Sequence, residues 1–308
     1  MAAELLLGID GGGSTTRAAL ADAQGRILGV GTTGSSNLQI VGLEGVVAAV
    51  EVAIQAARRA AGVASDAPVK VACLGLAGAD RPGDRERVST ALRVRSLAER
   101  LLLVSDSELV LAAGCPEGWG LALVSGTGSI CFGRAPDGRT ARAGGWGYLL
   151  GDEGSGFAIA QQALRLAART ADGRAEAHEL LEAALAFWGL TAPEELVPLV
   201  YQRVRGAPAA LAWFAPRVLD LASAGDPHAT AIVEEAATEL ARSVEVVRAR
   251  LELNASPLAL GGGILLHSSL LRERLLGQLP SAVGPVTLVE EATRGAVHLA
   301  LQELHARA

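Results

Sequence analysis

The stretch that decides the fold is Leu5-Leu6-Leu7-Gly8-Ile9-Asp10-Gly11-Gly12-Gly13-Ser14-Thr15-Thr16. Its first five residues have the apolar character of a buried strand, and the strand stops at an acidic residue followed by three glycines. Two further strands are expected at 17–21 and 26–30, joined by the turn Asp22-Ala23-Gln24-Gly25. The sequence thus predicts three consecutive strands, with a loop of glycines and hydroxyls between the first two.

This layout returns about 115 residues later, although the two copies share little sequence identity. A strand at 121–124 ends in Ser125-Gly126-Thr127-Gly128-Ser129, and strands at 130–134 and 140–143 follow around the turn 135–138. Strands precede helices in both halves, which predicts an α/β protein with two lobes and mixed sheets. The remaining expected elements are helix 43–61, strand 69–76, helix 84–94, strand 101–104, mostly helix over 154–251, strand 257–260, helix 265–278, strand 286–289 and a helix from 292.

The composition excludes several classes of function. A chain of 308 residues that is half apolar and 19% charged can bury a core in two domains. The net charge of −6 predicts no nucleic-acid partner and no attraction to an anionic membrane. Lys70 is the single lysine and lies in neither a GxxxxGK phosphate loop nor a protein-kinase lysine motif, so both are excluded.

The cysteines and the N-terminus indicate the compartment. Cys73, Cys115 and Cys131 are widely spaced and form no CxxC pair, which is typical of buried thiols in a reducing cytosol. The N-terminal apolar run lacks a basic region and is short for a signal peptide, and no run of about 18 apolar residues occurs. We expect a cytoplasmic protein.

Three glycine-rich loops are candidates for binding a nucleotide. In 10–15 the backbone N–H groups and hydroxyls can donate to phosphate, while Asp10 can hold Mg²⁺. The uncharged loop 125–129 offers the same donors. The third loop, Gly261-Gly262-Gly263, suits a flat group such as adenine. An ordinary hairpin at the first loop and a plain strand-to-helix turn at the third are the alternatives.

Acidic and aromatic residues are candidates for a second ligand. Asp106 follows a short strand and can act as a general base, or it can be the N-cap of a helix at 108–113. The run 144–156 combines Trp146, Tyr148, Asp152 and Glu153 with six glycines. Carboxylates can accept bonds from sugar hydroxyls while an indole covers a sugar face. The alternative is a structural loop in which Asp152 is an N-cap.

Other motifs are incomplete. Gly29-Val30-Gly31-Thr32-Thr33-Gly34 matches GxGxxG but lacks the following helix of a dinucleotide-binding fold. His178-Glu179 lacks the second histidine of a zinc HExxH site, and no GxSxG occurs.

The ordered set of motifs resembles the N-acetylglucosamine kinase branch of the BadF-type ATPases, within the sugar kinase/Hsp70/actin superfamily. The resemblance covers about residues 5–300, and its most specific parts are GGWG at 144–147 and GDEGS at 151–155. The motifs that carry it are Gly8-Ile9-Asp10-Gly11-Gly12-Gly13-Ser14, Ser36-Asn37, Ser105-Asp106, Val124-Ser125-Gly126-Thr127-Gly128-Ser129, Gly144-Gly145-Trp146-Gly147, Gly151-Asp152-Glu153-Gly154-Ser155 and Gly261-Gly262-Gly263.

The resemblance implies a fold of two ribonuclease-H-like lobes with the active-site cleft between them. Residues 1–118 would form the first lobe and 119–291 the second, with the final helix, about 292–308, returning to the first. It implies a homodimer that uses ATP and Mg²⁺ to phosphorylate a small sugar, N-acetylglucosamine, at its 6-hydroxyl group.

The resemblance also implies roles for individual residues. Asp10 would serve the metal, and Asp106 would be the catalytic base. The ATP-binding residues would be Gly11, Gly12, Gly13, Ser14, Thr15, Thr127, Gly128, Gly262 and Gly263. The sugar-binding residues would be Asn37, Asp106, Ser129, Gly145, Trp146 and Asp152.

One position departs from the family pattern. The eukaryotic N-acetylglucosamine kinases end the second phosphate loop in asparagine, where this chain has Ile130. Glucosamine and N-acetylmuramic acid are therefore alternative substrates. Alternatives of another class are an activator ATPase of a 2-hydroxyacyl-CoA dehydratase, which needs an iron–sulfur cluster for which Cys115 is the one candidate ligand, and a non-catalytic sugar sensor.

Overall fold

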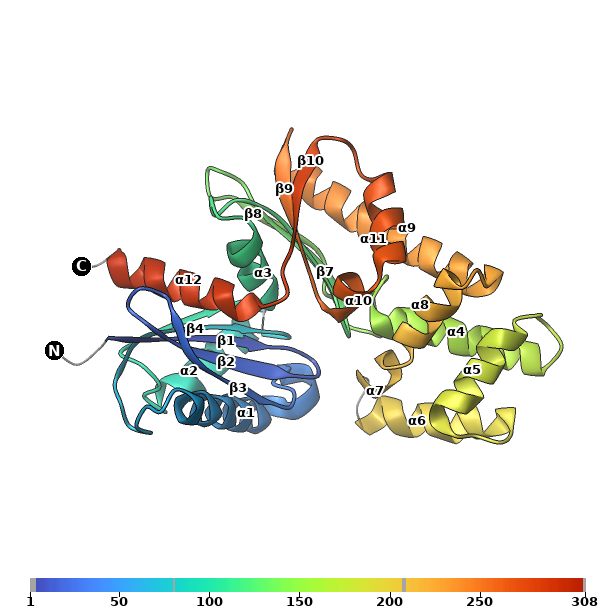
Figure 1. Cartoon of the computed structure of the whole chain (residues 1–308), viewed down its shortest axis with the longest axis horizontal. Coiled ribbons are helices and arrows are strands. Elements are labelled where there is room, and N and C mark those ends of the chain that lie inside the picture. The colour runs from blue at the N-terminus through green and yellow to red at the C-terminus, as the bar shows by residue number, and fades with distance from the viewer. Residues whose placement is uncertain (1–3, 80, 207–208, 307–308) are drawn as a thin grey trace. The chain divides into compact units, whose positions relative to one another are not determined.

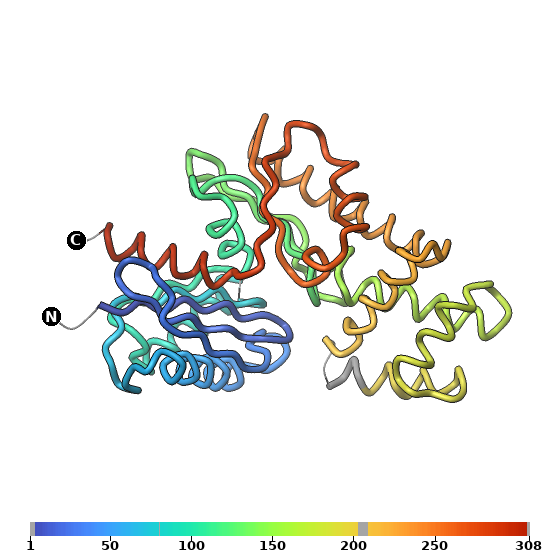
Figure 2. The backbone as a smooth tube through the Cα atoms, viewed as in Figure 1, coloured from blue at the N-terminus to red at the C-terminus, as the bar shows by residue number. Residues whose placement is uncertain are grey.

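A computed structural model describes the chain except for residues 1–3, 80, 207–208 and 307–308. It divides into two compact units (Figures 1 and 2), one formed by residues 1–122 and 289–308 and the other by residues 123–288. Each unit is built around a five-stranded sheet. The predicted α/β class with two mixed sheets is therefore confirmed.

The first unit has the strand order β3-β2-β1-β4-β5. Strand β1 pairs antiparallel with β2, which pairs antiparallel with β3, whereas β1, β4 and β5 run parallel. The bounds are β1 Leu5–Gly11, β2 Thr16–Asp22, β3 Ile27–Thr33, β4 Val69–Leu76 and β5 Arg100–Val104, with helices α1 Leu38–Ala60, α2 Pro82–Arg93, α3 Asp106–Gly114 and α12 Ala292–His305.

Alternation along β1 gives this sheet two buried faces. Leu5, Leu7 and Ile9 belong to one core cluster with side chains of α1 and α2. Leu6 belongs to a second cluster with side chains of α3 and α12. Successive side chains of a strand point to opposite faces, and helices cover both faces of this sheet. Strand β1 is therefore apolar from Leu5 to Ile9 and has its one acidic residue, Asp10, near its end. Figure 1 shows this three-layer arrangement.

Helix α1 begins earlier than the sequence predicts. Asn37 caps it by accepting from Gln39 N at 3.0 Å, and Gly42 interrupts it with a φ of 68°. The prediction of a start at Leu43 was wrong because the kink breaks the apolar spacing in the first turn. By length and composition α1 could also cross a membrane. In the structure α1 packs against β2 and β3, and its buried residues include Val50. It therefore packs as a core helix does.

The second unit repeats this strand layout with the order β10-β9-β6-β7-β8. Strands β7 and β8 are antiparallel, and β9 and β10 are parallel. The strands are β6 Gly120–Ser125, β7 Ser129–Arg134, β8 Thr140–Gly144, β9 Ser256–Gly261 and β10 Val283–Leu288. The helices are α4 Gly156–Ala171, α5 His178–Trp188, the 3₁₀ helix Pro193–Glu195, α6 Leu196–Gly206, α7 Ala209–Ala212, α8 Ala215–Ser223, α9 Pro227–Arg250, α10 Gly263–His267 and α11 Ser269–Gln278.

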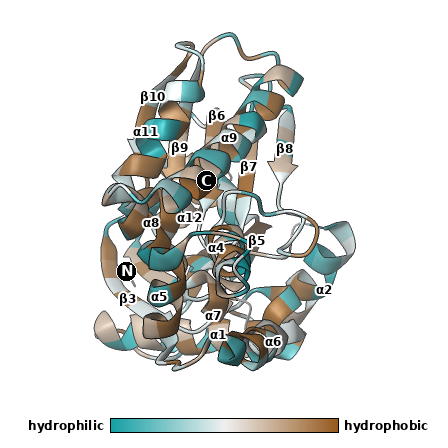
Figure 3. Ribbon diagram, turned by 90° about the vertical axis from the view of Figure 1, so that its right-hand side faces the viewer, coloured by the Kyte–Doolittle hydropathy of each residue, from teal (hydrophilic) through white to brown (hydrophobic). Residues whose placement is uncertain are grey.

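Helix α9 packs against β7 and β8 and against α11. It carries both hydrophobic and hydrophilic residues along its length (Figure 3), and its buried residues include Val233, Leu240 and Val247. The single helix predicted for 265–278 is in fact two helices. Ser268 has extended backbone and accepts from Leu271 N at 3.2 Å, so it ends α10 and caps α11.

Candidate active site

In the first unit, the polar residues gather at the carboxyl ends of the parallel strands. Asp10 pairs in register with Gly75 of β4, and Gly75 pairs with Val104, two residues before Asp106. Asp10, on β1, and Asp106, just after β5, therefore lie at the same end of the sheet. Only β4 separates these two strands, and neighbouring strands are about 4.8 Å apart. The carboxyl ends of parallel strands are where α/β proteins bind ligands.

The first glycine loop is held by the segments beside it. Gly11 O accepts from Ala77 N at 2.8 Å, and Gly12 O accepts from Ser36 N at 3.3 Å and from Ser35 Oγ at 3.1 Å. Gly12 N donates to Thr15 O at 2.9 Å, so residues 12–15 form a tight turn. Ser14 and Thr15 are exposed at its tip, and Gly12 and Gly13 are half-buried. These hydrogen bonds fix the shape of the loop, which suits a preformed site for phosphate.

Asp10 carries an unusual carboxylate. Its burial raises the pKa from the ordinary 3.8 to about 6, and only the charge of Arg17, on the neighbouring strand, opposes this effect. No hydrogen bond from the described residues contributes to the pKa. A half-buried carboxylate whose pKa is lowered by no hydrogen bond from the described residues, next to the first glycine loop, fits an oxygen ligand for Mg²⁺.

Asp106 is the first residue of α3, and the alternative of an N-cap was wrong. Ser105 is the cap, because its backbone is extended and its Oγ accepts from Glu108 N at 3.2 Å. The Asp106 carboxylate instead accepts from Ser107 N through Oδ1, at 2.9 Å. Asn37 lies at the same edge of the sheet, since Leu38 N donates to Ala77 O at 3.4 Å just beyond β4.

In the second unit, the loop 125–129 meets the N-terminus of α4 and the third glycine loop. Gly126 O accepts from Gly156 N at 2.8 Å, and Thr127 O accepts from Phe157 N at 3.3 Å. A Cβ built on Gly126 would lie 3.8 Å from Gly262 Cα. Gly262 has a φ of 87° and so needs a glycine. The structure therefore brings Thr127 and Gly128 together with Gly262 and Gly263.

Asp152 is the centre of a second group. Its carboxylate accepts from Gly147 N at 3.3 Å and from the backbone of Ser129. A Cβ on Gly128 would lie 2.7 Å from Asp152 Oδ2, so a larger residue would push this carboxylate aside. Burial raises the pKa of Asp152, and the two hydrogen bonds oppose that effect.

The alternative of Asp152 as an N-cap was also wrong. Ser155 caps α4 by accepting from Ala158 N at 3.2 Å. Asp152 instead has a positive φ of 62°, which is uncommon outside glycine and is often found at functional sites.

Two more predicted sugar-site residues lie beside this carboxylate. Gly145 N donates to Ser129 O at 2.9 Å, and Trp146 leaves 59% of its surface exposed. Backbone hydrogen bonds hold the loop that carries this exposed indole. Gly147 O accepts from Leu150 N at 3.1 Å and from Gly151 N at 2.9 Å. An exposed indole offers an apolar face for a ligand next to the buried carboxylate.

Sequence reasoning missed two residues that support the first loop. Arg17 lies beside Asp10, and Ser35 holds the loop together with Ser36, which the motif Ser36-Asn37 already included. It also missed Arg85, which pairs with Glu108 at 3.6 Å. The Ser105-x-x-Glu108 spacing is a capping-box signal that would have located the start of α3.

Comparison with known proteins decides the family. Residues 7–291 match the model of the BadF/BadG/BcrA/BcrD ATPase family. The chain belongs to this family. The resemblance inferred from its motifs is confirmed.

Relatives of this BadF-type ATPase cover nearly its whole length. An N-acetylmuramic acid/N-acetylglucosamine kinase of Clostridium acetobutylicum is 31% identical over 97% of this chain and 98% of its own. An N-acetyl-D-glucosamine kinase of Dictyostelium discoideum is 29% identical over 92% and 93%. The crystal structure of a candidate N-acetylglucosamine kinase of Chromobacterium violaceum matches with a TM-score of 0.78 and 30% identity, over 97% of this chain and 99% of that one.

Proposed function

We propose that this BadF-type ATPase is an ATP-dependent kinase that phosphorylates the 6-hydroxyl group of an amino sugar, N-acetylglucosamine first. The observation that carries the proposal is that two carboxylates, those of Asp106 and Asp152, lie in different environments. Asp106 starts a helix at the edge of the first sheet, and Asp152 is buried beside an exposed indole in the second unit. The relatives, which are named as kinases of such sugars, support the same activity.

The proposal assigns each residue a step. Asp106 accepts the proton of the sugar hydroxyl as that oxygen attacks the terminal phosphate of ATP. The N–H groups and hydroxyls of Gly12, Gly13, Ser14, Thr127 and Gly128 bind the phosphates, and those of Gly11 and Thr15 complete the first cradle. Gly262 and Gly263 would lie near the adenosine. Asp10 would hold Mg²⁺, which supplies positive charge to the phosphates when it is bound.

The sugar is oriented by side chains from both sequence halves. In the proposal, Asn37 and Asp106 bind sugar hydroxyls, Asp152 and Ser129 accept from or donate to others, and Trp146 covers the apolar face of the ring. Ser129 Oγ donates to Glu153 O at 2.7 Å, so its lone pairs can still accept from a hydroxyl.

The choice among amino sugars rests on Ile130. A Cβ built on Gly145 would lie 2.8 Å from Ile130 Cδ1, so this aliphatic side chain packs against the GGWG loop. It offers no hydrogen bond to an acetamide, and apolar contacts discriminate weakly. We therefore propose a broad hexosamine kinase that prefers N-acetylglucosamine or glucosamine to glucose by about 10- to 100-fold, or about 1.4–2.7 kcal/mol. N-acetylmuramic acid is the second candidate because the relative with 31% identity is named for both sugars.

The test is a comparison of kcat/KM for glucose, glucosamine, N-acetylglucosamine and N-acetylmuramic acid with ATP. The position of the new phosphate is read by NMR. Preference for an amino sugar with phosphate on O6 supports the proposal. Preference for glucose, or no phosphorylation of any hexose, contradicts it.

The activator alternative is not favoured. Cys73, Cys115 and Cys131 are all buried, and Cys115 Sγ donates to Leu121 O at 3.8 Å. A cluster shared by two subunits needs a cysteine at a surface. A purified protein with an iron–sulfur absorbance band would reverse this preference.

The proposal extends to the setting of the enzyme. We infer a cytoplasmic homodimer, and buried free thiols are consistent with a reducing compartment. Light scattering coupled to size-exclusion chromatography measures the oligomeric state, and a mass of 31.4 kDa would indicate a monomer.

A further inference from the structure

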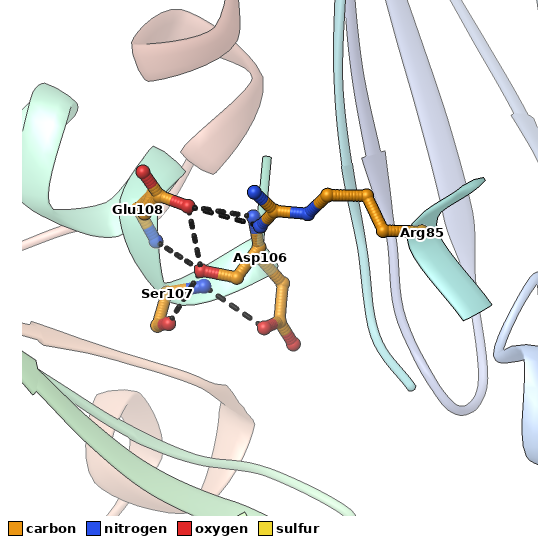
Figure 4. A network of polar contacts seen from close by, with 5 residues as sticks. Arg85, Asp106, Ser107 and Glu108 are labelled. Carbon is orange, nitrogen blue, oxygen red and sulfur yellow. Dashed lines mark hydrogen bonds and ion pairs between the residues drawn. The ribbon is translucent and has the colours of Figure 1, made fainter. Parts of the chain in front are cut away.

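A polar network surrounds the first turn of α3 (Figure 4). Glu108 Oε1 accepts from Ser105 N at 3.0 Å, and Ser105 Oγ accepts from Glu108 N at 3.2 Å. Ser105 Oγ and Ser107 Oγ lie 2.9 Å apart. Arg85 reaches across from α2, and its Nη2 lies 3.6 Å from Glu108 Oε1.

This arrangement places two carboxylates in one helical turn. The side chain of Glu108 is only 16% exposed, and Asp106 lies two residues before it. The positive end of the helix dipole favours acidic groups at these positions, and two residues that are two positions apart on a helix do not face each other. Arg85 adds a full positive charge from another helix, so the net charge near Asp106 depends on it.

Arg85 interacts with this network through its charge, in the ion pair with Glu108. Its Nε is buried and has no hydrogen-bond partner among the described residues. Its backbone belongs to α2, which packs elsewhere against α1 and β5. One donor of Arg85 thus has no partner among the described residues, while its guanidinium group faces the mostly buried carboxylate of Glu108. This combination indicates that Arg85 compensates the negative charge of Glu108.

We propose that Arg85 and Glu108 are positioning residues for Asp106. Glu108 fixes the first turn of α3 through the capping box, and Arg85 offsets the negative charge of Glu108. The carboxylate of Asp106 then stays in the orientation given by Ser107 N, directed away from Glu108 in Figure 4. This inference rests on the proposed function, in which Asp106 is the base.

The test compares Arg85→Met, Glu108→Gln and the double variant. Methionine keeps the aliphatic part of the arginine, and glutamine keeps the acceptor of the capping box without its charge. Arg85→Met should lower kcat at least about tenfold, since small misplacements of a catalytic group are costly, with the KM for ATP within about twofold. The double variant should recover to within about threefold of wild type, because the charge that Arg85 offsets has gone.

A matched control is Arg95→Met. Arg95 pairs with Glu51 of α1 at the same 3.6 Å, in the same unit, and both side chains are exposed. This variant should keep wild-type kcat, and melting temperatures should show that all the variants fold.

The outcomes separate this inference from the proposed function. If wild type is active and folded Arg85→Met matches it, the positioning role fails alone. The role fails also if Arg85→Met is impaired and the double variant is no better, because the arginine then acts other than by offsetting Glu108. If wild type phosphorylates no amino sugar, the proposed function fails and this inference fails with it.

Discussion

Replacing Asp10 by asparagine tests two properties of this residue separately. One is the effect of its buried charge on folding stability, and the other is its proposed role as a metal ligand. Burial at the end of β1 raises the pKa of this carboxyl group from 3.8 to about 6, and Arg17 only partly opposes the rise. The folded state therefore binds the proton more tightly than the unfolded state. Above about pH 6 the group is ionised in both states, and the folded protein carries a poorly compensated charge.

The size of the effect follows from the change in pKa. A rise from 3.8 to about 6 corresponds to about 3 kcal/mol of folding free energy. This is an upper limit, because Asp10 is half-buried and an amide also loses hydration there. Asp10→Asn should therefore raise the free energy of unfolding at pH 8 by about 1–3 kcal/mol, or the melting temperature by about 2–4 °C per kcal/mol. The gain should shrink as the pH falls from 6 towards 4, where the wild-type carboxyl is protonated in the folded state.

The assay is urea unfolding of both proteins without nucleotide or metal, from pH 4 to pH 8. Asp22→Asn is a control of opposite sign, since hydrogen bonds from Arg26 and Gln24 hold the pKa of Asp22 below its ordinary value. Asp22 contributes stability at neutral pH that is lost as the pH falls through its folded pKa, so Asp22→Asn should destabilise at pH 8. An Asp10→Asn protein that is less stable than wild type at pH 8 would refute the argument from burial.

The same variant tests the metal. Asp10→Asn should lose Mg²⁺-dependent phosphorylation, and Mg²⁺ with ATP should no longer raise its melting temperature as it does that of wild type. A variant that is stabilised as predicted and also keeps full activity would leave the folding argument intact and remove Asp10 from metal binding.

Three further variants test the rest of the site and the fold. Asp106→Asn should lower kcat at least about 10²-fold with little change in melting temperature, because it loses the base but keeps the shape; steady-state kinetics measure this, and near-normal turnover excludes Asp106 as the base. Trp146→Ala should lower kcat/KM for the sugar about tenfold, or about 1.4 kcal/mol, without destabilising the protein, since its indole is 59% exposed; an unchanged KM for the sugar contradicts stacking. Gly31→Ala should destabilise by about 1–3 kcal/mol in urea unfolding, because the new Cβ would lie 2.6 Å from Ala56 Cβ and clash with the α1 backbone; unchanged stability would show that α1 can move away.

The strands could be predicted closely from the sequence. Strand β4 was expected at 69–76 and is found at Val69–Leu76, and the expected strand at 5–9 extends by two residues to Gly11. Helices on both faces make these strands apolar along most of their length, and glycine or polar residues mark their ends. The helix starts were less accurate, because a proline at N1 in α2 and the kink at Gly42 in α1 hide the beginning of the apolar spacing.

The residues of the candidate site could be selected from the sequence, but their arrangement in space could not. Glycine loops and acidic residues show their chemistry locally, so Asp10, Thr127 and Asp152 could be selected from the sequence. Their surroundings depend on residues distant in sequence. The burial that raises the pKa of Asp10 comes from the packed sheet, and Arg85 reaches Glu108 from 23 positions away in the chain.

The N-cap alternatives at Asp106 and Asp152 are wrong for one physical reason. Aspartate and serine are about equally good N-caps, so composition cannot decide which of two nearby residues takes the cap. In both cases the serine takes it: Ser105 has a ψ of 158° and caps α3, and Ser155 has a ψ of 167° and caps α4. A capping carboxylate would be consumed by the N–H groups of the helix. With a serine in that role, each aspartate keeps its charge near the positive end of a helix. Asp106 Oδ1 accepts from a single helix N–H group, that of Ser107, and Asp152 accepts from Gly147 N and the backbone of Ser129. The proposed roles of base and sugar ligand use these two charges.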